Sequence, residues 1–185
     1  MNSRETAPRF HCLMGDFRRK ATAMKIEWIP DLKLPDNFIS EMQIAANKSC
    51  EFEGISVPCS VCVRLCSDDA IQEINRQYRG IDKSTDVLSF PAVSYPPGRT
   101  AGTCQNLLRE EYDDDTRCCF LGDIIISVPH LYTQAEAYGH SPLREAAYLL
   151  VHGICHLMGY DHINADDKQK MRIREEQILS NRDQI

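Results

Sequence analysis

The segment that most constrains the fold is HGICHLMGYDH, which spans residues 152–162. His152 and His156 are four residues apart, so they share one face if the segment is helical. Gly159 predicts the end of that helix, because glycine adopts the left-handed conformation at little cost. The chain can then turn back and bring His162 close to the other two imidazoles. The sequence therefore predicts a helix, a sharp return and a cluster of three histidines.

Three neutral imidazoles are a typical ligand set for a catalytic zinc ion, which keeps one position open for water or substrate. A structural zinc site is normally closed by a fourth protein ligand. Cys155 does not readily supply it, because it lies beside His156 on another face of the helix. We predict that His152, His156 and His162 bind one metal ion, which we expect to be zinc, although nickel, copper and iron also suit imidazole ligands. The alternative is three histidines that serve the core or the surface without a metal.

The same spacing occurs in zinc proteases with the pattern HExxHxxGxxH, but here Gly153 replaces the glutamate that is their general base. General acid–base catalysis by such a carboxylate is worth roughly a hundred- to ten-thousand-fold in rate. Glycine cannot supply it. Cleavage of a phosphodiester chiefly needs charge stabilisation at the phosphate, which an arginine or a lysine can provide. The pattern therefore favours phosphodiester hydrolysis, with a zincin-like metalloprotease as the alternative.

Two further segments precede the histidines, namely NRQYRGIDKSTDVLSFP at residues 75–91 and LGDIII at residues 121–126. In this order the three segments resemble the YbeY family of endoribonucleases, from about Met24 to the end of the last helix. The resemblance implies a metal held by the three histidines and cleavage of single-stranded RNA. It implies a role in ribosomal RNA maturation, particularly at the small-subunit 3′ end, and in ribosome quality control. A non-catalytic ribosome-assembly factor with a structural metal is a further alternative.

The resemblance also implies site residues and partners. The functional arginine of the family falls on Arg79, whose planar guanidinium could hold a phosphate through two hydrogen bonds. From the residues alone, the alternative is a surface arginine paired with Asp82. Asp86 and Ser89 are candidate substrate-binding residues, although Asp86 can equally order the turn into the next strand. The implied partners are the small ribosomal subunit, a small-subunit ribosomal protein and a ribosome-associated GTPase.

Charge adds a constraint on any RNA site. The net charge of −6 argues against a nucleic-acid partner, because phosphate binding usually requires a basic surface. An RNA site would be compatible with this charge if a local groove holding Arg64, Arg76, Arg79 and Lys83 were basic. Asp123 is costly to bury within its apolar run without a partner, so it either orients a ligand imidazole or caps a neighbouring backbone group.

Hydrophobic periodicity and capping signals predict the secondary structure of residues 24–182, which we assign to a single domain. Residues 92–117 show no periodicity and are expected to form a solvated loop. The order of elements indicates an α+β fold, with a small mixed sheet of about four strands covered by about five helices. Strands are expected at residues 24–29, 55–65, 87–90 and 118–128, and helices at residues 36–48, 68–78, 129–138, 142–157 and 164–179.

Residues 1–23 differ from the rest of the chain. They carry five Arg or Lys residues and lack the apolar run of a secretory signal. We interpret them as a disordered extension, with a transit peptide or a start codon assigned too early as alternatives.

The nine cysteines are odd in number, and Cys118 and Cys119 are adjacent, which favours buried free thiols in a reducing compartment. No apolar run approaches the ~20 residues of a membrane span. We therefore expect a cytoplasmic protein without a membrane partner.

Overall fold

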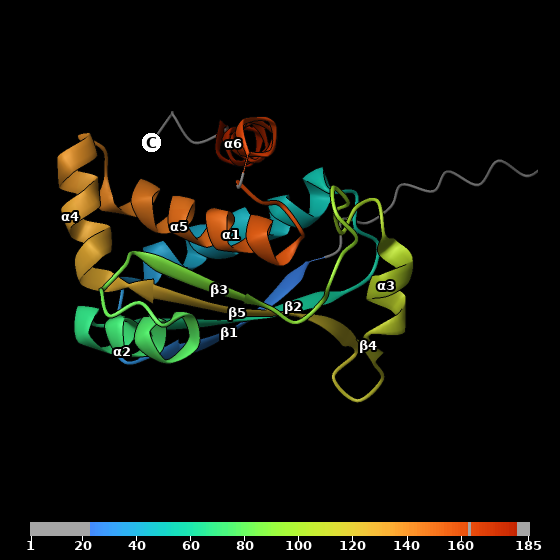
Figure 1. The fold of residues 1–185 in the computed structure, drawn as a ribbon, viewed down its shortest axis with the longest axis horizontal. Helices are drawn as coiled ribbons and strands as arrows, with labels where there is room; N and C mark the ends of the chain where they lie inside the picture. The colour runs from blue at the N-terminus through green and yellow to red at the C-terminus, as the bar shows by residue number, and fades with distance from the viewer. Residues whose placement is uncertain (1–22, 163, 181–185) are drawn as a thin grey trace, which may run out of the picture.

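A computed structural model describes residues 23–162 and 164–180 of the chain, so the predicted N-terminal extension lies almost wholly outside the described residues. Five strands and six helices occur in the described part, arranged around one sheet (Figure 1). In chain order they are β1 (Met24–Pro30), α1 (Asp36–Phe52), β2 (Cys59–Cys66), α2 (Asp68–Arg79), β3 (Val87–Pro91), α3 (Gln105–Glu110), β4 (Tyr112–Asp113), β5 (Cys118–Ser127), α4 (Val128–Tyr138), α5 (Pro142–Leu157) and α6 (Ala165–Leu179).

The sheet is mixed, with the strand order β1-β2-β5-β3 and β4 paired to the first residues of β5. Strands β1, β2 and β5 run parallel, whereas β3 and β4 run antiparallel to β5. The predicted α+β fold with a mixed sheet is confirmed, and the predicted elements are present with small shifts at their ends.

The expectation of a loop throughout residues 92–117 is wrong, because α3 and β4 lie within this segment. Both elements are too short for a periodic pattern to reveal them, since α3 has six residues and β4 has two. Helix α3 is anchored by the buried side chain of Leu108. Strand β4 forms a hairpin with β5, in which Tyr112 faces Cys119.

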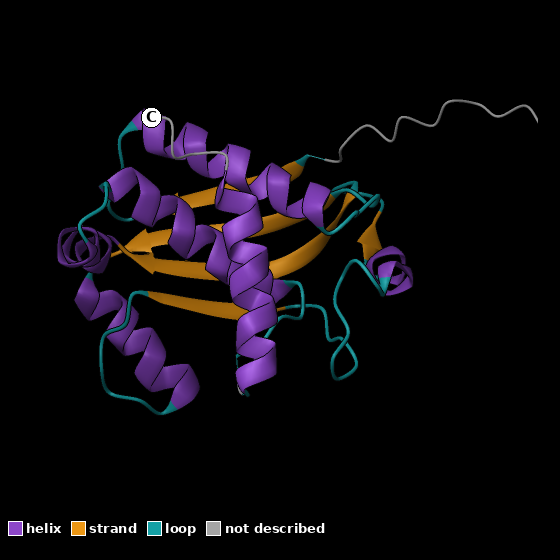
Figure 2. Ribbon diagram, turned by 90° about the horizontal axis from the view of Figure 1, so that it is seen from above, coloured by secondary structure: helices purple, strands orange, loops and turns teal. Residues whose placement is uncertain are grey.

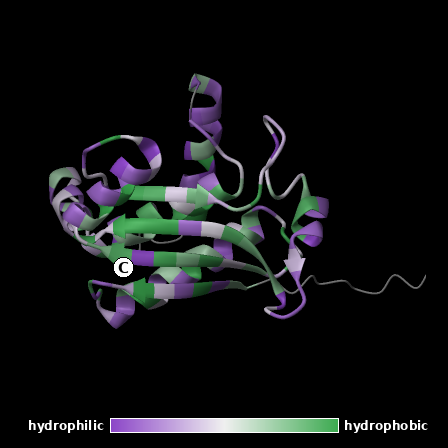
Figure 3. Cartoon of the chain, turned by 60° about the horizontal axis from the view of Figure 1, so that its bottom comes forward, coloured by the Kyte–Doolittle hydropathy of each residue, from purple (hydrophilic) through white to green (hydrophobic). Residues whose placement is uncertain are grey.

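Helices cover the two faces of the sheet unequally. Helices α1 and α5 lie on one face, α6 crosses above them, and α2 lies on the other face (Figures 1 and 2). The alternation in β2 explains this arrangement, because Val61, Val63 and Leu65 belong to the main core, while Cys62 and Arg64 point to the α2 side. Figure 3 shows this second face, where apolar and polar residues alternate along the strands.

The N-terminal cap of helix α5 and its contact with the sheet fix the position of the histidine segment. Ser141 caps its N-terminus, with the Ser141 hydroxyl accepting a hydrogen bond from the Arg144 amide at 3.2 Å. Pro142 occupies the first turn, as its missing amide hydrogen permits. Gly153 lies so close to β5 that an added Cβ would be 2.9 Å from Cγ2 of Ile124. The helix therefore rests directly on the sheet at the level of the histidines.

Two predictions drawn from composition can also be compared with the structure. All eight cysteines in the described residues are free thiols, and seven of them are buried. None of the helices in residues 23–162 and 164–180 combines the length and the hydropathy that a membrane span requires.

Candidate metal centre

The structure brings the three predicted histidines together. His152 and His156 lie one turn apart on α5, and His162 approaches them from the segment that follows the helix. One ring nitrogen from each lies within 4.8 Å of the others, and the Nε2 atoms of His152 and His156 are 3.2 Å apart. Two of the rings belong to half-buried residues, and the third belongs to an exposed one. Of the described residues, only these form such a group.

The return of the chain after α5 depends on Gly159, whose φ of +89° lies in the left-handed region. An added Cβ would also lie 2.8 Å from the carbonyl oxygen of Arg99 and 2.8 Å from the ring of Tyr95. The next two residues complete the turn. Asp161 accepts a hydrogen bond from the His162 amide at 2.7 Å, so its carboxylate shapes the segment that carries the third imidazole.

Hydrogen bonds to Nδ1 determine which nitrogens of two histidines face the centre. Nδ1 of His152 lies 2.7 Å from Oε1 of Glu175, and Nδ1 of His156 lies 3.1 Å from the carbonyl oxygen of Tyr160. A carboxylate and a carbonyl only accept, so each Nδ1 is the donor and carries the proton. Each Nε2 therefore carries a lone pair that is available for a metal ion, and the two Nε2 atoms are 3.2 Å apart.

This arrangement fits a metal ion. Zinc–imidazole bonds of 2.0–2.1 Å in a tetrahedron separate ligand nitrogens by roughly 3.3 Å, close to the 3.2 Å between the two Nε2 atoms. Burial, together with the neighbouring His152 and His162, lowers the pKa of His156 to about 4. His156 is therefore neutral at physiological pH, as a metal ligand must be.

Glu175 was not predicted from the sequence, and of the two alternatives for Asp123, the one in which it orients a ligand imidazole is wrong. Asp123 is exposed and lies beside Cys62, where burial and then the Asp123 carboxylate raise the pKa of the Cys62 thiol. Glu175 instead lies on α6 between the buried side chains of Met171 and Ile178. A charged residue at an apolar position of the helix was the signal that could have revealed it.

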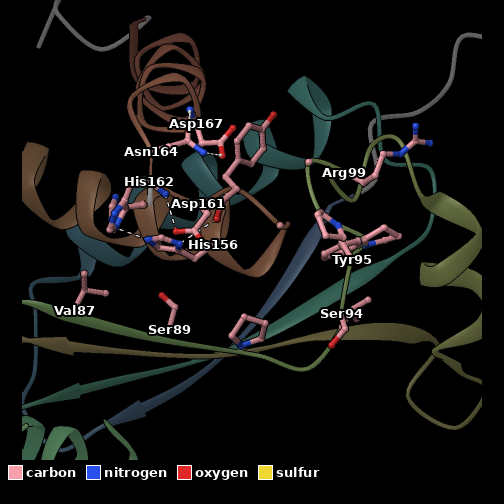
Figure 4. Close-up of a pocket in the computed structure, with 18 of the residues that line it drawn as sticks. Val87, Ser89, Ser94, Tyr95, Arg99, His156, Asp161, His162, Asn164 and Asp167 are labelled. Atoms are coloured by element: carbon pink, nitrogen blue, oxygen red, sulfur yellow. Dashed lines mark hydrogen bonds between the residues drawn. The ribbon is translucent and has the colours of Figure 1, made fainter. Parts of the chain in front are cut away.

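The histidines line one side of a cavity of about 900 Å³, and the other predicted site residues line the same cavity. Arg79, Asp86 and Ser89 come from the end of α2, the following loop and β3. Figure 4 shows His156 and His162 facing Ser89 across the cavity, with Tyr95 and Arg99 at its other end. Tyr95 and Arg99 belong to the segment that we expected to be a solvated loop.

Arg79 is available for a ligand. It lies in the last turn of α2, which Gly80 ends in the left-handed conformation at φ +70°. In the described part of the chain, no hydrogen bond or ion pair engages its guanidinium. The alternative partner, Asp82, instead accepts a hydrogen bond from Gln72 at 2.9 Å. The role of Arg79 itself stays a prediction.

Asp86 orders the start of β3. Its Oδ1 accepts from the Val87 amide at 2.8 Å and from the Thr85 hydroxyl at 3.0 Å, and its Oδ2 accepts from Gln134 at 3.0 Å. Burial opposes ionisation, but these hydrogen bonds, led by that from Gln134, lower the pKa of Asp86 below its ordinary value. The turn-ordering alternative therefore has direct support, while substrate contact by Asp86 or Ser89 stays a prediction.

The expected basic groove is not formed by the four predicted residues. Arg76 forms an ion pair with Glu73 at 2.7 Å. Arg64 forms one with Asp31 at 2.8 Å and lines a different hollow, beside Asp123. The described residues that line the cavity include the cations Arg79 and Arg99, but not Lys83. Arg79 and Arg99 thus share the lining with the carboxylates of Asp86, Asp161 and Asp167.

Comparison with known proteins agrees with the geometry. The family model described as "Endoribonuclease YbeY" matches residues 30–183. An endoribonuclease YbeY of Clostridium acetobutylicum is 47% identical over 133 residues, which cover 71% of this chain and 80% of the relative. One from Clostridium botulinum is 37% identical over 152 residues, which cover 80% of this chain and 90% of the relative. The solution structure of TM1509 from Thermotoga maritima shares the fold, with a TM-score of 0.51, 23% identity and coverage of 85% and 90% of the two chains. The chain therefore belongs to the YbeY endoribonuclease family.

Proposed function

We propose that this protein is a metal-dependent endoribonuclease that cleaves single-stranded RNA during ribosomal RNA maturation and ribosome quality control, with the small-subunit 3′ end as its main site. The observation that carries the proposal is the cavity itself. Three imidazoles, each with one ring nitrogen within 4.8 Å of the others, line one side, and the same lining includes the guanidinium of Arg79, which no described residue engages. The family relationship supports RNA as the substrate.

In this proposal His152, His156 and His162 hold one zinc ion, and nickel is the second candidate. A divalent cation bound there would polarise a phosphate oxygen and lower the pKa of a water molecule. Arg79 donates two parallel hydrogen bonds to the phosphate and stabilises the negative charge that develops on it. Asp86 and Ser89 contact the RNA strand near the cleaved bond.

The packing of Gly153 supports a phosphodiester rather than a peptide as the substrate. The position that carries the catalytic glutamate in zinc proteases faces Ile124 of β5, where even a methyl group would be too close at 2.9 Å. A glutamate side chain fits there only if the side chain of Ile124 shifts. The metalloprotease alternative thus lacks its general base. A purely structural metal is also disfavoured, because the histidines open onto a large cavity.

Three substitutions test this function. His156→Ala is expected to abolish both metal binding and RNA cleavage. Arg79→Ala is expected to keep the metal and to reduce cleavage by about 10²–10³-fold, the usual effect of removing a charge-stabilising donor. Arg76→Ala is the matched control, because Arg76 lies on the same helix and pairs with Glu73 at the surface.

The readouts are metal content by elemental analysis and cleavage of a single-stranded RNA. Full activity of the Arg79 variant would remove the proposed role of this residue. Cleavage of casein by the metal-loaded protein, with RNA left intact, would favour the metalloprotease instead.

We also propose where the protein acts and with what. Residues 24–182 form the catalytic domain of a cytoplasmic protein, and its partners are the small ribosomal subunit, a small-subunit ribosomal protein and a ribosome-associated GTPase. Co-sedimentation with small subunits and pull-down of the GTPase test these contacts directly.

A further inference from the structure

We propose that Glu175 is a positioning residue. It fixes the tautomer of His152 and thereby determines how tightly the three-histidine site holds its metal. The inference rests on the metal site of the proposed function, which it extends to a residue on another helix.

The contact is short and shielded from water. Oε1 of Glu175 lies 2.7 Å from Nδ1 of His152, and the two side chains are 7% and 21% exposed. The residues belong to α6 and α5, which pack against each other. Within the described residues, His152 is the one hydrogen-bond partner of the Glu175 side chain. The carboxylate is thus dedicated to this imidazole.

The surroundings of Glu175 are unfavourable for a carboxylate. Its neighbours on the buried side of α6 are Met171, Ile178 and Leu179, which pack in one apolar cluster with residues of α5. A carboxylate in such a place loses its hydration, and one hydrogen bond restores only part of that energy. An apolar side chain would suit the packing better. The interaction that offsets the cost of burying this charge is the hydrogen bond to His152.

The carboxylate has two effects on the imidazole. It holds the proton on Nδ1, so that Nε2 keeps the lone pair that faces Nε2 of His156 at 3.2 Å. The negative charge of the carboxylate also makes Nε2 of His152 more basic, so this nitrogen binds a cation more tightly. Without this acceptor, the proton could move to Nε2 and occupy the position of the metal.

Substitution of Glu175 alters the metal affinity of the site without changing any of the three histidine ligands. The corresponding acceptor for His156 is the backbone carbonyl of Tyr160, which no substitution removes. The orientation of His152, by contrast, depends on a side chain from a separate helix. The affinity of the site is therefore coupled to the docking of α6 against α5.

The first test measures affinity for Zn²⁺ by competition with a chromophoric chelator. Loss of the acceptor in Glu175→Ala is expected to weaken binding by about 10–100-fold, the usual effect of removing such a partner. Glu175→Gln keeps an accepting oxygen without the charge, so its loss should be smaller. Glu176→Gln is the matched control, because Glu176 is the next residue of α6 and is 65% exposed beside Arg172. It should bind within twofold of the wild type.

The second test uses the metal-free protein, which separates the inference from the proposed function. Ring ¹⁵N chemical shifts should show only the Nδ1–H tautomer for His152 in the wild type, and both tautomers in Glu175→Ala. A residue that merely stabilises the fold would lower the melting temperature without changing the tautomer. An unchanged tautomer, or Zn²⁺ affinity within twofold of the wild type, would overturn the inference. If the alanine variant does not fold, Glu175→Leu, which fills the same apolar surroundings without an acceptor, decides by the same two measurements. A wild type that binds no Zn²⁺ and cleaves no RNA would instead refute the proposed function, while the tautomer still tests Glu175.

Discussion

Single residues set limits on the chemistry of this site, and Gly153 sets the clearest one. An added Cβ would lie 2.9 Å from the Ile124 side chain of the central strand β5, so any larger residue requires this side chain to shift within a close-packed core. The short distance between α5 and the sheet therefore favours glycine at position 153.

This packing predicts the effect of restoring the protease glutamate. Gly153→Glu is expected to destabilise the fold by at least about 1–3 kcal/mol through overpacking, without creating proteolytic activity. Gly153→Ala, with a single added methyl group, should have a smaller effect, because the better helix propensity of alanine offsets part of the clash. Thermal unfolding and a casein assay measure both consequences. A glutamate variant as stable as the wild type would contradict the packing argument.

The ionisation of Asp86 is expected to make the stability of the fold depend on pH. Because the pKa of Asp86 is below its ordinary value of 3.8 in the folded chain, its ionised form stabilises the fold above about pH 4. That contribution is lost as the pH falls through the lower, folded-state pKa. Asp86→Asn should therefore cost about 1–2 kcal/mol near neutral pH, and less as the pH falls below 4.

Urea unfolding at pH 7 and pH 3 tests this dependence. Asp82→Asn, an exposed carboxylate in the same loop, is the control and should change stability by less than about 0.5 kcal/mol. A pH-independent difference for Asp86→Asn would show that the charge of this carboxylate is irrelevant to stability.

At the scale of elements, α6 connects the turn after α5 to the end of α1. Nε of Arg174 forms an ion pair with Oε1 of Glu53 at 2.8 Å and donates a hydrogen bond to the Tyr160 hydroxyl at 3.0 Å. The Tyr160 hydroxyl in turn donates to the same Glu53 oxygen at 2.5 Å. The Glu53 side chain is 3% exposed and the Arg174 side chain is 26% exposed. Because the Tyr160 carbonyl accepts from His156, this network also supports the backbone beside the histidines.

Removal of Arg174 should therefore be costly. Arg174→Leu leaves the buried Glu53 carboxylate without its cation, and we expect a loss of about 2–3 kcal/mol in the free energy of unfolding. Arg172→Leu is the matched control, because Arg172 is on the same helix, is 75% exposed and pairs with Glu176 at the surface. It should cost less than about 1 kcal/mol. Equal losses in the two variants, measured by urea denaturation, would contradict the importance of the buried pair.

The whole molecule has a core that does not depend on the metal. The main cluster of buried residues joins the sheet to α1 and α5, and none of the three histidines belongs to it. A metal bound to α5 and the following turn therefore adds stability locally and does not organise the fold.

Metal removal should accordingly inactivate the protein without unfolding it. At a metal concentration a hundred times the dissociation constant, binding stabilises by about 2.7 kcal/mol. For a domain of this size, its loss lowers the melting temperature by roughly 5–10 °C. Melting curves with and without chelator, recorded beside RNA cleavage, measure both effects. Unfolding at room temperature on chelation would support the structural-metal alternative.

The sequence by itself determined the local features of this protein. The cap at Ser141, the glycine turn at Gly159 and the clustering of three histidines follow from backbone geometry within a few residues, and the sequence expresses such geometry directly. The strands and longer helices were predictable for the same reason, since each repeats a pattern over several turns or residues. The short α3 and β4 were not, because too few residues carry the pattern.

Only the tertiary structure decided which distant residues meet the histidines. Glu175 reaches His152 because α6 docks across α5, and Arg79 lines the same cavity although 73 residues separate it from His152 in the chain. Such contacts depend on the packing of whole elements, which minimises exposed apolar surface over the entire molecule. A short stretch of sequence does not reveal which elements pack together. The sequence alone therefore could not distinguish Glu175, which pairs with His152, from Asp123, which does not.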